Sequence, residues 1–237
     1  MNPPSGWGLN SFTAAFDAAR ENQYATFHNK APAKDDLVQI DWLLWRLLEG
    51  KIDPTPLQPM NFFLRSHSCF RAASACAMAG QVYEAVVLQR ATLEAAAYGL
   101  HIGPNEQRTQ LWFSRGNSAA AAERVRKEFS FGSLKRHFRQ DFPDIASAFV
   151  SLYETLIDFG AHSNEPGLSI STNIRQEEGK RMFDTVYLHG DGLPLDFGLK
   201  NAARVGLWTM LAYQKVYPGQ FDLAHVAEAV QEMTSRH

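Results

Sequence analysis

The stretch from Gln81 to His101 constrains the fold more than any other part of the sequence. It has the pattern of one helix in which the only charged residues are Glu84, Arg90 and Glu94. A helix that is apolar on most of its surface is expected in the middle of a helical bundle. An ionised side chain is costly there unless an opposite charge and hydrogen bonds accompany it. The sequence therefore predicts that Arg90 and Glu94, four residues apart, face protein partners and not bulk water.

Length and composition favour one domain with a substantial core. The 237 residues are 45% hydrophobic and carry a formal net charge of −2, which argues against a protein that coats nucleic acid or a membrane surface. Cys69 and Cys76 lie seven positions apart on a predicted helix, which separates them by about 10 Å, too far for a disulfide. The sequence has neither a secretory-signal pattern nor an apolar stretch long enough to span a bilayer. We therefore expect a cytoplasmic protein without membrane contact, and no motif points to a cofactor.

Helical spacing recurs along most of the chain and predicts an all-α, multi-helix bundle. We expect an extended N-terminal arm, residues 1–9, followed by a single helical domain, residues 10–237. Its centre is a helical hairpin of residues 60–79 and 81–101, in which Gly80 turns the chain. Alternating apolar residues predict one small β-hairpin insert at about residues 168–189. Further helices are expected from residue 11 and over residues 35–49, 105–114, 118–129, 133–141, 143–160, 196–217 and 222–235.

The charged pair on the central helix allows two interpretations. Arg90 and Glu94 can satisfy each other as an ion pair that fixes the packing of their neighbours. Alternatively they line a polar pocket, because Tyr98 and His101 continue the same stripe. The preceding helix carries a second polar stripe, His67, Arg71 and Ser74, which either faces Glu94 or reaches solvent. In the pocket interpretation the ligand-binding residues are Arg90, Glu94, Tyr98, His162, His67 and Arg71.

His162 follows Gly160 in a segment rich in turn-forming residues, the setting in which loops present functional side chains. It is also spaced regularly with Glu154 and Asp158, and such a set could in principle ligate a metal. The helical wheel places both carboxylates on the solvated face, so we expect no metal site there. His162 and Glu94 remain the candidates for catalytic residues.

A basic, phenylalanine-containing segment has the composition of a nucleic-acid-binding groove, although acidic residues dilute it. The alternative is a solvated face with the aromatic rings turned inward. The basic residues are Arg124, Arg126, Lys127, Lys135, Arg136 and Arg139.

The hairpin bearing residues 90–94, followed later by Gly160-Ala161-His162-Ser163-Asn164 and a terminal helix, resembles uncharacterised bacterial all-helical families that are similar to HEPN domains. The resemblance covers residues 60–217 and implies the fold more than an activity. HEPN ribonucleases act without metal and place a histidine four to six residues after an arginine on one helix. No arginine precedes His162 at that spacing.

We therefore predict a protein that binds a small anionic ligand or a protein partner through a polar pocket around Arg90 and Glu94, where the guanidinium would hold the anion. A second copy of the chain, in a homodimer, is one of the candidate partners. One alternative is a HEPN-like, metal-independent ribonuclease in which His162 is the acid or base and Arg90 stabilises phosphate charge. Another is a structural or interaction protein whose buried ion pair serves no site.

Overall fold

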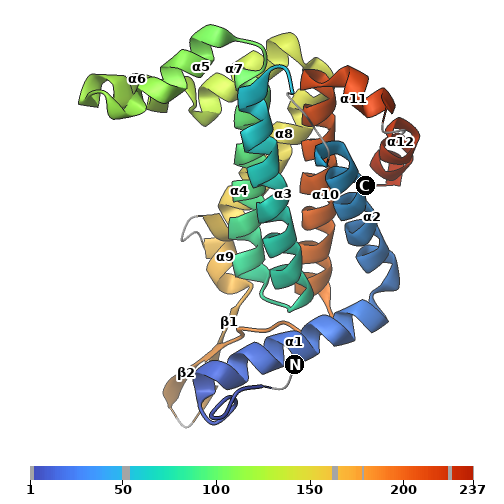
Figure 1. The fold of residues 1–237 in the computed structure, drawn as a ribbon. Helices are drawn as coiled ribbons and strands as arrows, with labels where there is room; N and C mark the ends of the chain where they lie inside the picture. Colours follow the sequence, from blue (N-terminus) through green and yellow to red (C-terminus); the bar gives the residue numbers. More distant parts are fainter. Residues whose placement is uncertain (1–2, 50–53, 162–164, 178, 224–225, 237) are drawn as a thin grey trace.

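The computed structural model describes residues 3–49, 54–161, 165–177, 179–223 and 226–236. It is an all-α bundle with one small antiparallel hairpin, as the sequence predicts (Figure 1). The α-helices are α1 (Ser11–Asn29), α2 (Ala31–Leu48), α3 (Leu57–Met78), α4 (Val82–Ile102), α5 (Glu106–Phe113), α6 (Ala119–Glu128), α7 (Phe131–Asp141), α8 (Pro143–Leu156), α9 (Glu165–Ser169), α10 (Leu193–Val216), α11 (Pro218–Leu223) and α12 (Ala227–Arg236). The strands are β1 (Thr172–Glu177) and β2 (Lys180–Thr185), and short helical turns cover Ser114–Gly116 and Ile157–Ala161.

The α3–α4 hairpin forms the centre of the bundle and confirms the predicted arrangement. Helices α3, α4 and α10 stand side by side, with α2 and α8 packed around them (Figure 1). Small residues allow these close approaches. A Cβ atom on Gly206 of α10 would lie only 2.6 Å from Ile40 and 2.7 Å from Phe70, so a side chain at this position would displace these two core residues.

Helix α1 is less buried than the others. It runs across the lower end of the bundle in Figure 1, and among its residues only Thr26 is buried. The Asn10 side chain caps it by accepting a hydrogen bond from the backbone N–H of Thr13 at 2.9 Å. Two amides attach it to the end of α3: Asn22 donates to the Ala79 carbonyl at 3.1 Å and Gln23 to the Ala75 carbonyl at 2.9 Å.

Helices α5, α6 and α7 form a layer at the other end of the bundle, where α5 and α6 share a small apolar cluster with the ends of α3 and α4. Ile102, Val125 and Phe129 are its buried members. Four partly buried residues, Phe62, Tyr98, Leu111 and Trp112, pack around them.

The hairpin insert is shorter than the predicted range of residues 168–189. Its register pairs Thr172 with Thr185 and Glu177 with Lys180. Beyond the strands, the chain returns to the bundle at His189, whose backbone N–H donates to the Gly80 carbonyl at 2.8 Å. Gly80 has a φ of +77°, and a Cβ there would lie 2.1 Å from the His189 carbonyl oxygen.

Several predicted helix boundaries were wrong because of prolines. Helix α2 begins at Ala31 and not at residue 35, since Pro32 fits the first turn of a helix, where its missing N–H is not needed. For the same reason α3 begins at Leu57, with Pro59 in its first turn. The last predicted helix, residues 222–235, is two helices, α11 and α12.

Within the described part of the chain, none of the helices combines the length and the hydropathy needed to cross a membrane.

Candidate functional site

The predicted pair on α4 is an ion pair completed by a tyrosine. The Nε of Arg90 donates to Oε1 of Glu94 at 2.9 Å, and Nη2 of Arg90 donates to the Tyr153 hydroxyl at 3.1 Å. That hydroxyl donates in turn to Oε1 of Glu94 at 3.0 Å. The two charged side chains are only 20% and 29% exposed, so protein groups and not bulk water provide most of their surroundings.

Tyr153 is held in place from both sides. Its ring, on α8, stacks on Phe131 with centroids 4.2 Å apart. The Arg90 guanidinium lies 5.1 Å from the centroid of the Tyr153 ring. Burial first, and then the charge of Glu94, raises the pKa of Tyr153 to about 12, so it remains a hydroxyl donor at physiological pH. Neither Arg90 nor Glu94 lines the cavities described below.

Other members of the predicted pocket lie elsewhere or are not described. Tyr98 packs its ring among Phe62, Trp112 and Phe129. Burial and the charge of Glu94 raise the pKa of Tyr98. His162 lies outside the described residues.

His67 and Arg71 form a second charged cluster, which is centred on Asp41 of α2. Oδ1 of Asp41 lies 2.7 Å from Nε2 of His67 and accepts from Nε of Arg71 at 2.6 Å. Nη2 of Arg71 donates to Oδ2 of Asp41 at 3.0 Å. The stripe on α3 therefore meets α2 and does not hydrogen bond to Glu94. Of the two alternatives for the stripe, solvent exposure holds for Arg71, which is 55% exposed, but not for the buried His67.

The Asp41 carboxylate makes three hydrogen bonds in this cluster. Burial alone would raise its pKa, but the hydrogen bonds from His67 and Arg71 outweigh burial and lower the pKa to about 2. The carboxylate and the guanidinium balance each other's charge. Nη1 of Arg71 makes no hydrogen bond to the described residues and is still available as a donor.

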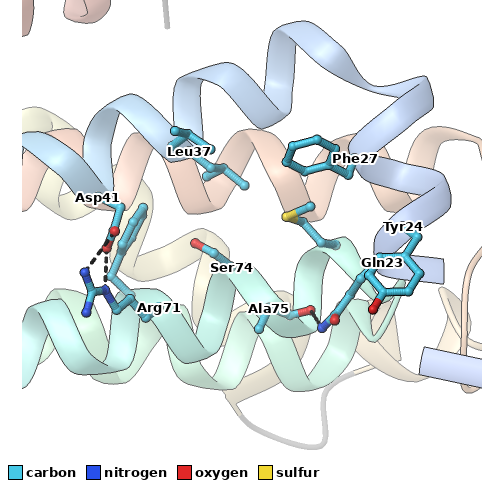
Figure 2. A pocket seen from close by; sticks show the side chains of 11 residues that line it. Gln23, Tyr24, Phe27, Leu37, Asp41, Arg71, Ser74 and Ala75 are labelled. Carbon is cyan, nitrogen blue, oxygen red and sulfur yellow. Dashed lines mark hydrogen bonds and ion pairs between the residues drawn. The ribbon is translucent and has the colours of Figure 1, made fainter. Parts of the chain in front are cut away.

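A cavity of about 400 Å³ lies next to this cluster, between α1, α2 and α3 (Figure 2). Most of its surface is apolar. Asp41 and Arg71 lie at one end, and Gln23 and Tyr24 at the other (Figure 2). The apolar lining residues are Phe27, Leu37, Val38, Phe70, Ala75 and Met78.

Ser74 supplies the remaining polar group of this lining. Its hydroxyl oxygen is buried and has no hydrogen-bond partner among the described residues. A buried hydroxyl without a partner costs about 1–3 kcal/mol relative to one that is satisfied. Figure 2 shows this hydroxyl directed from α3 into the space below Leu37. A ligand atom that accepts a hydrogen bond would therefore be stabilised there.

A third polar cluster joins α4 to α7. The Nδ1 atoms of His101 and His137 lie 2.9 Å apart, and Nε2 of His101 lies 3.0 Å from Oε1 of Glu128. Arg108 donates to the same Glu128 oxygen at 3.2 Å and to the His101 carbonyl at 2.9 Å. Burial, and then the charge of Arg108, lowers the pKa of both histidines. His101 thus points into this cluster and does not extend the Arg90–Glu94 stripe as expected.

Some residues of the basic segment form ion pairs, and others line a second cavity. Arg126 pairs with Glu123, and Lys135 lies 3.6 Å from Glu154. Arg124, Lys127 and Arg136 line a polar cavity of about 470 Å³ between α6 and α7. Arg139 is exposed and does not line it. Phe129 and Phe138 are buried and Phe131 is half-buried, as the solvated-face alternative expects.

The carboxylates considered for a metal, Glu154 and Asp158, are both exposed. In the described ranges of the chain, no three or more His, Cys, Asp or Glu side chains are grouped so that they could hold a metal ion. Both cysteines are free thiols.

Sequence reasoning missed Asp41, Tyr153 and the cluster around Glu128. Each belongs to a helix distant in sequence from its partners, so no spacing rule could connect them. One signal was present: Asp41 interrupts the apolar stripe of α2 between Ile40 and Leu44, where a charge needs a partner.

Comparisons with known proteins add no relative. No protein-family model matches the chain, and neither a curated protein nor a solved structure matches it. The resemblance to HEPN domains therefore remains a prediction.

Proposed function

We propose that this protein binds a small, largely apolar molecule with an uncharged hydrogen-bond-accepting end in the cavity between α1, α2 and α3. The observation that carries the proposal is the buried Ser74 hydroxyl, which has no hydrogen-bond partner among the described residues, beside a cavity of about 400 Å³. Cavities of this size and lining hold small ligands and orient them with a few polar groups.

The charge of the site argues for an uncharged polar end. Asp41 and Arg71 compensate each other, so a ligand anion would gain attraction from Arg71 but would be repelled by the adjacent carboxylate. A ligand ammonium would be attracted by Asp41 but repelled by the adjacent Arg71 guanidinium. A carbonyl or hydroxyl oxygen can accept from Ser74 and from the available nitrogen of Arg71 without either penalty. This changes the expected ligand from an anion to a neutral molecule and places Asp41 and Arg71, instead of Arg90 and Glu94, beside it.

The test uses 1-octanol as the probe, with octanoate and octylammonium as charged analogues of the same length. We expect 1-octanol to bind by isothermal titration calorimetry and to raise the melting temperature, because only bound native protein gains stability. Each charged analogue should bind at least about tenfold more weakly, equivalent to about 1.4 kcal/mol.

Three variants distinguish binding in the cavity from general effects of substitution on α3. Ser74→Ala should weaken 1-octanol binding about fivefold, or about 1 kcal/mol, while leaving the stability of the free protein unchanged or slightly higher. Ser74→Phe should abolish binding by filling the cavity. Ser68→Phe is the matched control, because Ser68 is exposed on the same helix and does not line the cavity. Equal binding by Ser74→Phe and Ser68→Phe, or no binding by the unmodified protein, would overturn the proposal.

A further inference from the structure

The second cavity is more polar than the first and is lined mainly by basic charged residues. It has a volume of about 470 Å³ and lies where the end of α6 meets the start of α7. Its charged lining residues are Arg124, Lys127, Glu128 and Arg136. Ser130, Gly132, Ser133 and Leu111 complete the lining.

Within the described part of the chain, the three cations of this cavity form no ion pair with a carboxylate. Among the described residues, no Asp or Glu oxygen lies within 4.0 Å of the charged nitrogens of Arg124, Lys127 or Arg136. Glu128 is the one carboxylate in the lining, and it already pairs with Arg108 and hydrogen bonds to His101. The cavity thus gathers positive charge that the protein does not neutralise, and a bound anion would relieve the mutual repulsion.

We infer that this cavity binds a compact polyphosphate group, meaning two or more linked phosphates. Lysine and arginine side chains together match the charge and the oxygen geometry of phosphate. The cavity is larger than a single phosphate requires.

The composition of the lining distinguishes this ligand from single-stranded nucleic acid. Proteins that bind single strands combine basic side chains with exposed aromatic rings on which the bases stack. No aromatic residue lines this cavity, and the rings of Phe129 and Phe138 are buried. Only the phosphate-binding half of such an interface is present, which favours recognition of the phosphates alone.

The test titrates tripolyphosphate by calorimetry into the full chain and into two double variants. Lys127→Gln/Arg136→Gln removes two lining cations and should weaken binding at least about tenfold. Arg126→Gln/Arg139→Gln removes the same total charge from the same two helices outside the cavity, and should change binding by less than about twofold, because exposed charges away from the ligand are screened by salt. All four residues are exposed, so the variants should fold, which circular dichroism checks.

A short oligouridylate is the second probe. We expect it to bind more weakly than tripolyphosphate, and equally in both double variants. Equal losses of tripolyphosphate binding in the two variants would overturn the inference, because they would show that binding depends only on the total charge of the protein. Absence of binding, or tighter binding of the oligouridylate that depends on Lys127 and Arg136, would also overturn the inference. None of these outcomes bears on the cavity that is tested with 1-octanol, because that cavity lies between α1, α2 and α3.

Discussion

Arg90 and Asp41 each stand at the centre of a charged cluster, but the two clusters are built differently. Arg90 finds its carboxylate one turn away on α4, and Tyr153 completes the arrangement. Asp41 reaches from α2 to His67 and Arg71 on α3, beside a cavity that α1 helps to enclose. The ion pair of the Arg90 cluster is formed within one helix, and an uncharged hydroxyl from α8 completes it. The ion pair of the Asp41 cluster crosses from α2 to α3, and a ligand-sized space lies beside it.

The largest effect that would test this contrast is on folding. Glu94→Leu leaves Arg90 half-buried without its carboxylate, so we expect a loss of about 2 kcal/mol of unfolding free energy, between the values typical of surface and buried pairs. Urea denaturation measures the loss. Binding of 1-octanol should not change, because Glu94 does not line the cavity.

Removing the whole cluster should restore most of that stability. The test is the triple variant Arg90→Met/Glu94→Leu/Tyr153→Phe, which removes all three polar side chains of the cluster together. Apolar replacements of buried ion pairs are often neutral. We expect this variant to lie within about 1 kcal/mol of the unmodified protein. A triple variant as unstable as Glu94→Leu would show that the cluster does more than satisfy itself.

A smaller effect is expected when the Asp41 cluster is exposed to acid, to which the Arg90 cluster provides the comparison. The pKa of Asp41 is about 2 in the folded protein against 3.8 for the unperturbed group, so its ionised form stabilises the fold above pH 3.8 and this contribution is lost as the pH falls towards 2. The stability advantage of the unmodified protein over Asp41→Asn should therefore shrink by about 1–2 kcal/mol across this interval, an amount reduced for partial exposure. Urea denaturation at several pH values checks it, and the subtraction removes the contributions of other groups. A difference that does not vary with pH would mean that Asp41 is not held ionised by its partners.

The smallest expected effect comes from Arg71. Its side chain is 55% exposed and His67 still contacts Asp41 without it, so Arg71→Gln should lower the unfolding free energy by less than about 1 kcal/mol. If the proposed site is correct, the same variant weakens 1-octanol binding. A stability loss as large as that of Glu94→Leu would erase the distinction between the two clusters.

The architecture followed from the sequence because helical periodicity is local. The apolar stretch around Arg90 and the small residues before Gly80 were sufficient to predict the central hairpin. Prolines misled the boundaries, since Pro32 and Pro59 fit the first turns of helices and do not mark connections.

The candidate site could be predicted only in part. His67 and Arg71 were identified as a polar stripe from their spacing on one helix. Their partner Asp41 lies on another helix, and which helices meet is decided by packing that spacing does not encode. The conspicuous pair was misleading for the same reason: Arg90 and Glu94 stand out because their neighbours are apolar, which says that they are enclosed but not that a ligand reaches them.

The contact between Gly80 and His189 has a consequence for engineering this chain. The antiparallel insert is joined to the bundle at its base, where the backbones touch too closely for any side chain at position 80. Its far end is different, because Ile174 and Phe183 are exposed along the strands that lead to it. A reporter peptide spliced between residues 177 and 180 should leave the rest of the molecule undisturbed, whereas even alanine in place of Gly80 would force the two segments apart.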